Sequence, residues 1–245
     1  AVISTVITDG EEAGAVALAD STATLTPGEY GNVICLQKSA DIESGGTAYV
    51  AAGTLIGRNA GASLDKLGMT TLEAFSTTRI YPGEASSAAT LNAGSVLDKT
   101  FANRLHNKLA RLNVPGINGG MYIAIAHDDC LYDLRNDAGA GGWMDVSKYA
   151  DPNSVLLNEV GTFAGIRFLR SSNVTVTDAS WSTTGDSYKI NVLGFNALGK
   201  GEASPLEIMV RPAYDNLDRF VNFGWKWNGV YGVIDTANMV QGIVA

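Results

Sequence analysis

The fold is decided by GGTAYVAAGTLIGRNAGASLDKLGMTTL, residues 45–72, which is the most helical stretch of the 245-residue chain. Ser44 precedes this stretch and can cap its first turn. The apolar residues recur every four positions and form one stripe along a helix: Ala52, Ile56, Ala60 and Leu64. The pattern predicts a long helix, and the alternative interpretation is a broken helix or a loop.

A stripe of glycines lies beside the apolar stripe of this helix, at Gly53, Gly57 and Gly61. Each glycine destabilises a helix interior by about 1 kcal/mol relative to alanine. Close approach of another backbone to a face without Cβ atoms would offset that cost. We therefore expect these three glycines to be packing residues at a close backbone contact.

A second helix is predicted C-terminal to the first, at residues 95–112. Ser95 and Asp98 make a capping signal at its start, and Asn113 and Pro115 stop it. Its apolar residues fall on one face: Leu97, Phe101, Leu105, Leu109 and Leu112. Its basic residues share another face: Arg104, Lys108 and Arg111.

Predicted strands flank the helical region on both sides, so the predicted class is α+β. Residues 1–34 have the pattern of an extended hairpin. Near the other end, four apolar residues alternate strictly with polar residues or glycine: Val221, Phe223, Trp225 and Trp227. This alternation predicts a strand with one aromatic face, which makes Trp225 and Trp227 candidate core residues. Asn228-Gly229 then predicts a hairpin turn.

The composition excludes several classes of protein. A hydrophobic content of 46% is enough for a sizeable core, and only 17% of residues are charged. This low charge fits a surface that is largely covered by neighbours, although a glycine-rich monomer fits it equally well. A net charge of -8 argues against a dedicated nucleic-acid binder. Cys35 and Cys130 are expected to be buried, unpaired thiols, and no apolar run is long enough to cross a membrane.

Residues with catalytic or metal-binding potential are few. His106 is expected to be solvated on the second helix. His127 is followed by Asp128 and Asp129, which could hold a metal, but consecutive side chains point in different directions and Asp128 is better explained as a helix cap. No nucleophile elbow or phosphate loop occurs. We therefore expect no catalytic residue, no cofactor and no metal.

A series of short motifs follows in order between about residues 120 and 230. The apolar run Tyr122–His127 is followed by the sequence YDLR at 132–135. Further motifs come after it: Gly142–Asp145, Lys148–Ala150, Asn158–Gly161, Gly165–Phe168 and Gly224–Lys226. Together they resemble the major capsid proteins of podovirus-like tailed phages related to the coliphage called N-four, which have the Hong Kong 97 (HK97-like) capsid fold. The chain departs from this pattern at Asp128, where family members often have proline.

The resemblance implies three structural regions. Residues 1–30 would be the E-loop hairpin, which reaches over a neighbouring subunit. Residues 31–78 and 212–245 would form the elongated P-domain, in which the spine helix packs on long antiparallel strands through its glycine stripe. Residues 79–211 would be the compact A-domain. The family's N-terminal arm would precede residue 1. We expect that the protein has this arm, and the alternative is that a phage protease removes it.

The resemblance also implies a function and its partners. The chain would be a non-enzymatic shell subunit that assembles into hexamers and pentamers around double-stranded DNA, without sequence specificity. Portal, scaffolding and decoration proteins would be further partners, with no membrane. The subunit would reside in the virion and assemble in the bacterial cytoplasm. The alternatives are an encapsulin-type compartment, a β-rich phage surface or tail-associated adhesin, and an undetected hydrolase, which the motifs disfavour.

Overall fold

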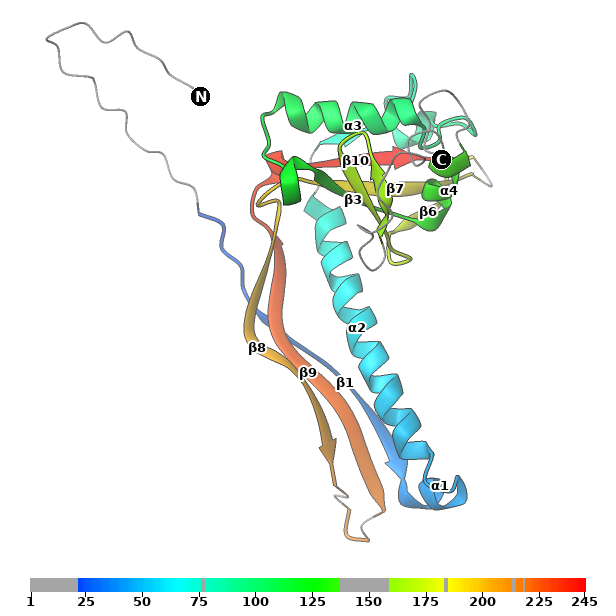
Figure 1. The fold of residues 1–245 in the computed structure, drawn as a ribbon. Coiled ribbons are helices and arrows are strands. Elements are labelled where there is room, and N and C mark those ends of the chain that lie inside the picture. The colour runs from blue at the N-terminus through cyan, green and yellow to red at the C-terminus, as the bar shows by residue number, and fades with distance from the viewer. Residues whose placement is uncertain (1–21, 76–77, 137–158, 183–184, 213–214, 218) are drawn as a thin grey trace, which may run out of the picture.

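The computed structural model describes residues 22–75, 78–136, 159–182, 185–212, 215–217 and 219–245. The chain forms a long, narrow part built along one helix and a compact part at one end of that helix (Figure 1). Each part has its own β-sheet, so the predicted α+β class is confirmed. Within these ranges, no helix is both long enough and apolar enough to cross a membrane.

The elongated part is a three-stranded antiparallel sheet. Its strands lie in the order β1 (Gly28–Gln37), β9 (Phe220–Val233) and β8 (Leu198–Arg211). β9 continues straight through Asn228 and Gly229, so the hairpin turn predicted there is wrong. The reason is that Gly229 is paired on both sides, with Gly28 of β1 and Glu202 of β8, and these ladders hold β9 extended.

The long helix α2 (Ala48–Phe75) runs back along this sheet after the short helix α1 (Lys38–Glu43) turns the chain (Figure 1). This confirms the helix predicted at residues 45–72. The hydroxyl oxygen of Ser44 accepts a hydrogen bond from the backbone N–H of Ala48 at 3.1 Å, and so satisfies one of the free donors of the first turn.

The apolar stripe of α2, and not its glycine stripe, faces the sheet. Ala52, Ile56 and Ala60 are buried. They pack on the aromatic face of β9: Val221, Phe223, Trp225 and Trp227. The large rings fill the space between helix and sheet, so alanines fit opposite them and no close backbone approach is needed.

The expected close contact of the glycine stripe with the sheet of the same chain is therefore wrong. A Cβ atom added at Gly53, Gly57 or Gly61 would have no heavy atom within 4 Å. These glycines lie on a side of α2 that the described residues leave uncovered. None of the described residues packs closely enough against these glycines to offset their cost to the helix.

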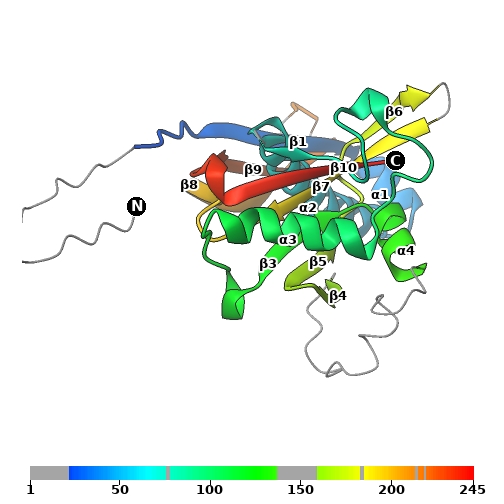
Figure 2. The same ribbon diagram turned by 90° about the horizontal axis from the view of Figure 1, so that it is seen from above.

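The compact part is a mixed seven-stranded sheet with two helices on one face (Figure 2). Its strands are β2 (Arg79–Ile80), β3 (Tyr122–Ala126), β4 (Glu159–Phe163), β5 (Ile166–Arg170), β6 (Val176–Ser182), β7 (Gly185–Leu193) and β10 (Met239–Val244). The helices are α3 (Lys99–Arg111) and α4 (Asp128–Asn136). The described residues also form three single-turn helices: Ala88–Thr90, Asn118–Gly120 and Thr236–Asn238.

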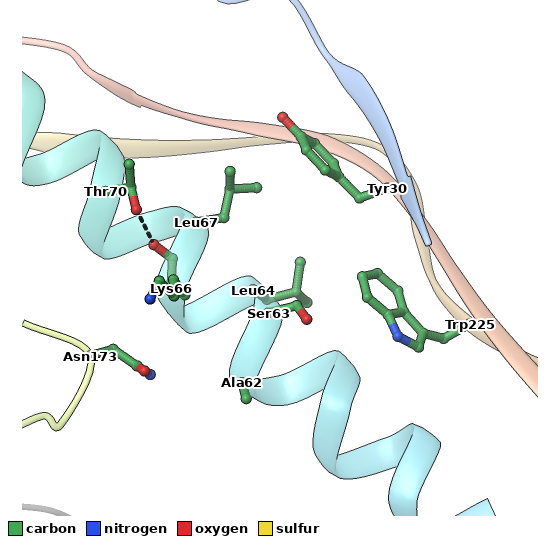
Figure 3. Close-up of a pocket in the computed structure, with 9 residues that line it drawn as sticks. All are labelled: Tyr30, Ala62, Ser63, Leu64, Lys66, Leu67, Thr70, Asn173 and Trp225. Carbon is green, nitrogen blue, oxygen red and sulfur yellow. Dashed lines mark hydrogen bonds between the residues drawn. The ribbon is translucent and has the colours of Figure 1, made fainter. Parts of the chain in front are cut away.

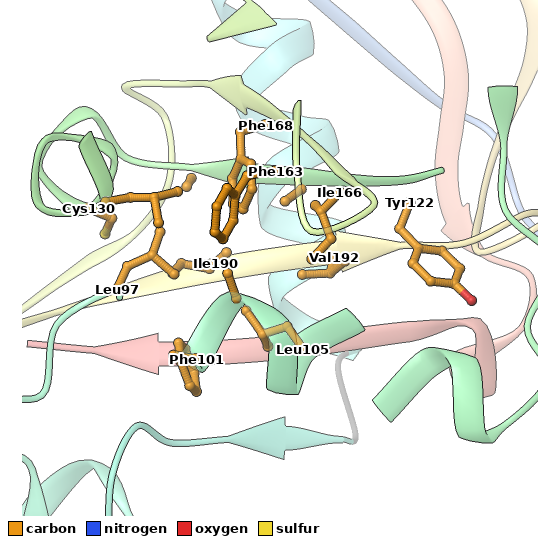
Figure 4. Packing of buried hydrophobic residues seen from close by; sticks show 14 of the residues in the cluster. Leu97, Phe101, Leu105, Tyr122, Cys130, Phe163, Ile166, Phe168, Ile190 and Val192 are labelled. Carbon is orange, nitrogen blue, oxygen red and sulfur yellow. The ribbon is translucent and has the colours of Figure 1, made fainter. Parts of the chain in front are cut away.

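The core of the compact part lies between this sheet and its helices (Figure 4). Phe101, Leu105 and Leu109 of α3 are buried against it, as the periodicity predicted. The helix begins later than predicted, because its cap is Asp98 and not Ser95. The Asp98 carboxylate accepts the backbone N–H of Phe101 at 2.7 Å, whereas Ser95 lies buried before the helix.

Two strands join a different part of the fold from the one that the expected regions assign to them. β8 falls within residues 79–211, yet it pairs with β9 in the elongated part. β10 falls within residues 212–245, yet it pairs with β7 in the compact part. The chain passes between the two parts several times, and a sequence pattern of strands does not specify which sheet each strand joins.

Candidate assembly surfaces

The two tryptophans of β9 form the centre of the elongated core. Trp225 is 5% exposed and Trp227 is 1% exposed. Each indole N–H has a partner, since Trp225 donates to Asn59 Oδ1 at 2.9 Å and Trp227 donates to Glu202 Oε1 at 2.6 Å. The first bond ties β9 to α2, and the second ties β9 to β8. Burial with satisfied donors makes these rings structural.

Glu202 holds Trp227 from the neighbouring strand. The hydrogen bond from Trp227, and then the nearby Lys200 ammonium at 3.2 Å, lower the pKa of the Glu202 carboxyl. The same Lys200 lies 5.5 Å from the centre of the Trp227 ring. Tyr30 of β1 stacks on the ring with a centroid distance of 5.8 Å. All three strands therefore contact the Trp227 ring.

An apolar groove of about 460 Å³ opens between α2 and the sheet, beside this core (Figure 3). It is bordered by Tyr30 and Trp225 on one side and by Leu64 and Leu67 on the other. Lys66 and Asn173 lie at its rim (Figure 3). It contains no cluster of catalytic or metal-binding side chains, so its chemistry suits apolar contact.

The edge strand β8 exposes apolar side chains along its C-terminal half. Leu206, Ile208, Met209 and Val210 are between 39% and 57% exposed. One edge of β8 pairs with β9, and no described strand pairs with its other edge. An exposed apolar edge strand is a surface on which another chain can dock.

Two large apolar side chains of α2 are exposed as well. Val50 is 71% exposed and Leu55 is 57% exposed, and the uncovered glycines lie on the same helix. Scattered apolar residues are normal on a monomer, but here they occur on the helix and on the sheet edge of one narrow part. This distribution is expected of a part that is covered by neighbours in an assembly.

One buried carboxylate, which the sequence patterns did not single out, joins the two parts. Glu73, in the last turn of α2, has a side chain that is 5% exposed. It accepts the backbone N–H of Thr175 at 2.8 Å and pairs with the ammonium of Lys189 on β7 at 3.5 Å. A buried carboxylate needs such partners, so Glu73 fixes the end of the long helix to the compact part.

The histidines considered in the sequence have structural surroundings. His106 is half-buried rather than solvated, with its ring 5.3 Å from that of Tyr122. His127 pairs with Asp129 at 3.1 Å. Asp128 is the first residue of α4 and not its cap. Among the described residues no three histidine, cysteine or acidic side chains are grouped so as to hold a metal.

Neither cysteine is in a disulfide, as expected from the sequence, but the expectation that both are buried is wrong for Cys35. Cys35 on β1 is exposed, whereas Cys130 on α4 is buried. Burial, and then the nearby Asp133 and Asp129 carboxylates, raise the pKa of Cys130 to about 12. The thiol of Cys130 is therefore protonated and behaves as an apolar core group.

No protein-family model matches the sequence, and no curated protein matches it either. Solved structures do match its fold. The capsid of Ralstonia phage GP4 has a TM-score of 0.66 and 10% identity, over 89% of this chain and 73% of that one. The capsid subunit of cyanophage Pam1 has a TM-score of 0.65 and 11% identity, over 96% and 82%.

A cellular compartment protein matches too. The holo encapsulin complex of Synechococcus elongatus has a TM-score of 0.55 and 10% identity, over 88% of this chain and 73% of that one. Phage capsid structures predominate among the similar structures. The chain therefore has the Hong Kong 97 capsid fold.

Proposed function

We propose that this chain is the major capsid protein of a tailed double-stranded DNA phage, which assembles into hexamers and pentamers to form an icosahedral head. The observation that carries the proposal is the fold shared with phage capsid subunits over 89% to 96% of the chain. The apolar groove, the exposed edge of β8 and the uncovered side of α2 support it, because each offers surface to further copies.

The regions of the fold have corresponding roles in this proposal. Residues 1–30 are the E-loop, of which residues 22–30 are described. The elongated part is the P-domain, with α2 as its spine helix and with β8 included. The compact part is the A-domain, with β10 included. A non-enzymatic role is part of this proposal, because shell formation requires contacts and no chemistry.

The proposal also covers the phage group, the partners of the chain and its location. The ordered motifs around Tyr122–His127 support the group of podovirus-like phages related to coliphage N-four. Partners are many copies of the chain, packaged DNA, and portal, scaffolding and decoration proteins. The protein acts in the virion after assembly in the bacterial cytoplasm.

Gradient sedimentation and negative-stain microscopy of the purified chain test this function. We expect fast-sedimenting, round shells of uniform diameter. A slowly sedimenting species without shells, at concentrations and salt conditions in which capsid subunits assemble, would argue against the proposal. The variant Ile208→Asp, on the exposed edge of β8, should reduce shell formation if that edge is an interface. Thr177→Asp, at an exposed position on β6 of the compact part, gives a matched control for the added charge outside the proposed surfaces.

An encapsulin-type compartment is the second candidate, because a holo encapsulin shares the fold. The contents of isolated native particles distinguish the two functions. Nuclease-protected DNA is the result expected for a phage capsid, and an enclosed protein cargo is the result expected for an encapsulin. The adhesin alternative has lost its main support, because Trp225 and Trp227 are buried and present no aromatic face to a glycan.

A further inference from the structure

The outward side of α3 carries a concentrated positive charge. Arg104, Lys108 and Arg111 are exposed, and with Asn107 and with Ile80 of β2 they line a groove of about 520 Å³. The helix, KTFANRLHNKLAR, contains no acidic residue. This is the opposite of the chain as a whole, which has a net charge of -8.

No described acidic side chain forms an ion pair with a cation of the basic groove. Neither Lys108 nor Arg111 forms an ion pair with any side chain in the described ranges. Arg104 donates to the backbone carbonyl of Gly83 at 3.2 Å, which orients the guanidinium without neutralising it. Like charges spaced three and four residues apart on a helix repel each other, so an anion in the groove would stabilise it.

The spacing of these cations suits a polyanion. Seven residues of helix separate Arg104 from Arg111, which is about 10 Å along the axis. The same length of duplex DNA carries about six phosphate charges. A small anion would contact only one of these cations at a time, whereas a phosphate backbone would contact all three together.

An acidic protein segment fits the groove less well. Protein interfaces have an apolar, often aromatic centre that provides most of the affinity. Among the described residues that line the groove, the half-buried Ile80 is the only one with an apolar side chain. Non-specific phosphate contacts need only charged groups on long side chains, and these are the main groups that the groove presents.

We propose that the groove between α3 and β2 is a non-specific binding site for the phosphate backbone of duplex DNA, through Arg104, Lys108 and Arg111. The inference rests on the proposed capsid function and identifies the surface that meets the packaged genome. Acidic residues outnumber basic residues in the chain as a whole, so we expect contact with DNA to concentrate at this row of cations.

Fluorescence anisotropy with a labelled 30-base-pair duplex of random sequence, titrated with the full chain kept unassembled, tests the proposal. The test variant is Arg104→Gln/Lys108→Gln/Arg111→Gln. The matched control is Arg58→Gln/Lys66→Gln/Arg211→Gln, which removes the same charges from exposed positions on α2 and β8. Because Arg104 also contacts Gly83, the double variant Lys108→Gln/Arg111→Gln serves if the triple variant does not fold.

Three lost phosphate contacts should reduce the slope of log affinity against log salt by about 2.7. Between 50 and 200 mM salt, the affinity of the unchanged chain should therefore fall about 40-fold more than that of the triple variant. The control should keep the slope of the unchanged chain. Equal slopes for unchanged chain and triple variant, an equal loss in the control, or no binding at 50 mM would each overturn the proposal.

Two further measurements show which of the two proposals a negative result contradicts. Tighter, groove-dependent binding of poly-glutamate than of the duplex would overturn the DNA assignment in favour of an acidic protein partner. Microscopy tests the capsid function independently of DNA binding. If the unchanged chain forms shells but the triple variant binds DNA as well as the unchanged chain does, only this inference is contradicted. If the unchanged chain binds DNA but forms no shells, the capsid function is contradicted.

Discussion

Substitution of Gly57 by alanine should stabilise the subunit. An added Cβ at this position has no heavy atom within 4 Å, so it meets no steric obstacle. Gly57 lies in the interior of α2, where alanine is favoured over glycine by about 1 kcal/mol. For a chain of this size, that gain corresponds to a rise in melting temperature of about 2–4 °C.

Differential scanning fluorimetry and urea unfolding of the unassembled subunit measure the effect of Gly57→Ala. Gly31→Ala provides the contrasting control, because its Cβ would lie 2.7 Å from the carbonyl oxygen of Trp225 on the paired strand. We expect this control to destabilise the subunit by about 1–3 kcal/mol. A loss of stability in Gly57→Ala would refute the placement of the glycine stripe on the uncovered side of α2.

Shell assembly provides a separate test of whether another copy packs against Gly57. If a second copy approaches this side of α2, Gly57→Leu should fold normally and yet fail to form shells, since the larger side chain would keep the copies apart. If Gly57→Leu forms shells like those of the unchanged chain, no close backbone contact exists at this glycine in either state.

Three further predictions concern the core and its charged contacts. Ile56→Ala should destabilise the subunit by about 2–5 kcal/mol in urea unfolding, because Ile56 is fully buried against β9; a smaller loss would mean that the helix packs loosely. Glu73→Ala should cost about 1.5–3 kcal/mol, since it leaves Lys189 and the Thr175 N–H without their partner; wild-type stability would mean that Glu73 does not join the two parts. Glu202→Gln should be less stable than the unchanged chain at neutral pH. The lowered pKa of Glu202 means that its contribution is present at neutral pH and is lost as the pH falls through that lowered pKa, so the two melting curves should converge in acid. A constant difference would contradict this.

The sequence predicted the parts of the fold that depend on periodicity. The four-residue repeat through Ile56 predicted α2, and the strict alternation through Trp225 and Trp227 predicted a strand with a buried aromatic face. Both patterns report which side of an element faces the core. That information is local, and burial of the apolar side follows from it.

The features that depend on distant parts of the chain could not be predicted. The turn expected at Asn228-Gly229 is absent because β1 and β8 pair with β9 on both sides. The glycine stripe was expected at the helix–sheet contact, but the rings of Trp225 and Trp227 set that distance. Both errors arise where tertiary contacts override a local preference.

Only some of the candidate surfaces could be predicted from the sequence. The basic face of α3 was visible, because Arg104, Lys108 and Arg111 follow the helical repeat. The absence of ion pairs with described acidic side chains required the structure. Glu73 gave no signal at all, since a single carboxylate at a helix end is usually solvated. The exposed edge of β8 became apparent only once the sheet order was known.

Cryo-electron microscopy of particles assembled from the purified chain tests the central claim most directly. The account predicts closed icosahedral shells, with each elongated part covered by neighbouring copies along α2 and the edge of β8. A purified chain that remains monomeric near 25.7 kDa, with α2 and the edge of β8 still exposed to solvent, would contradict it.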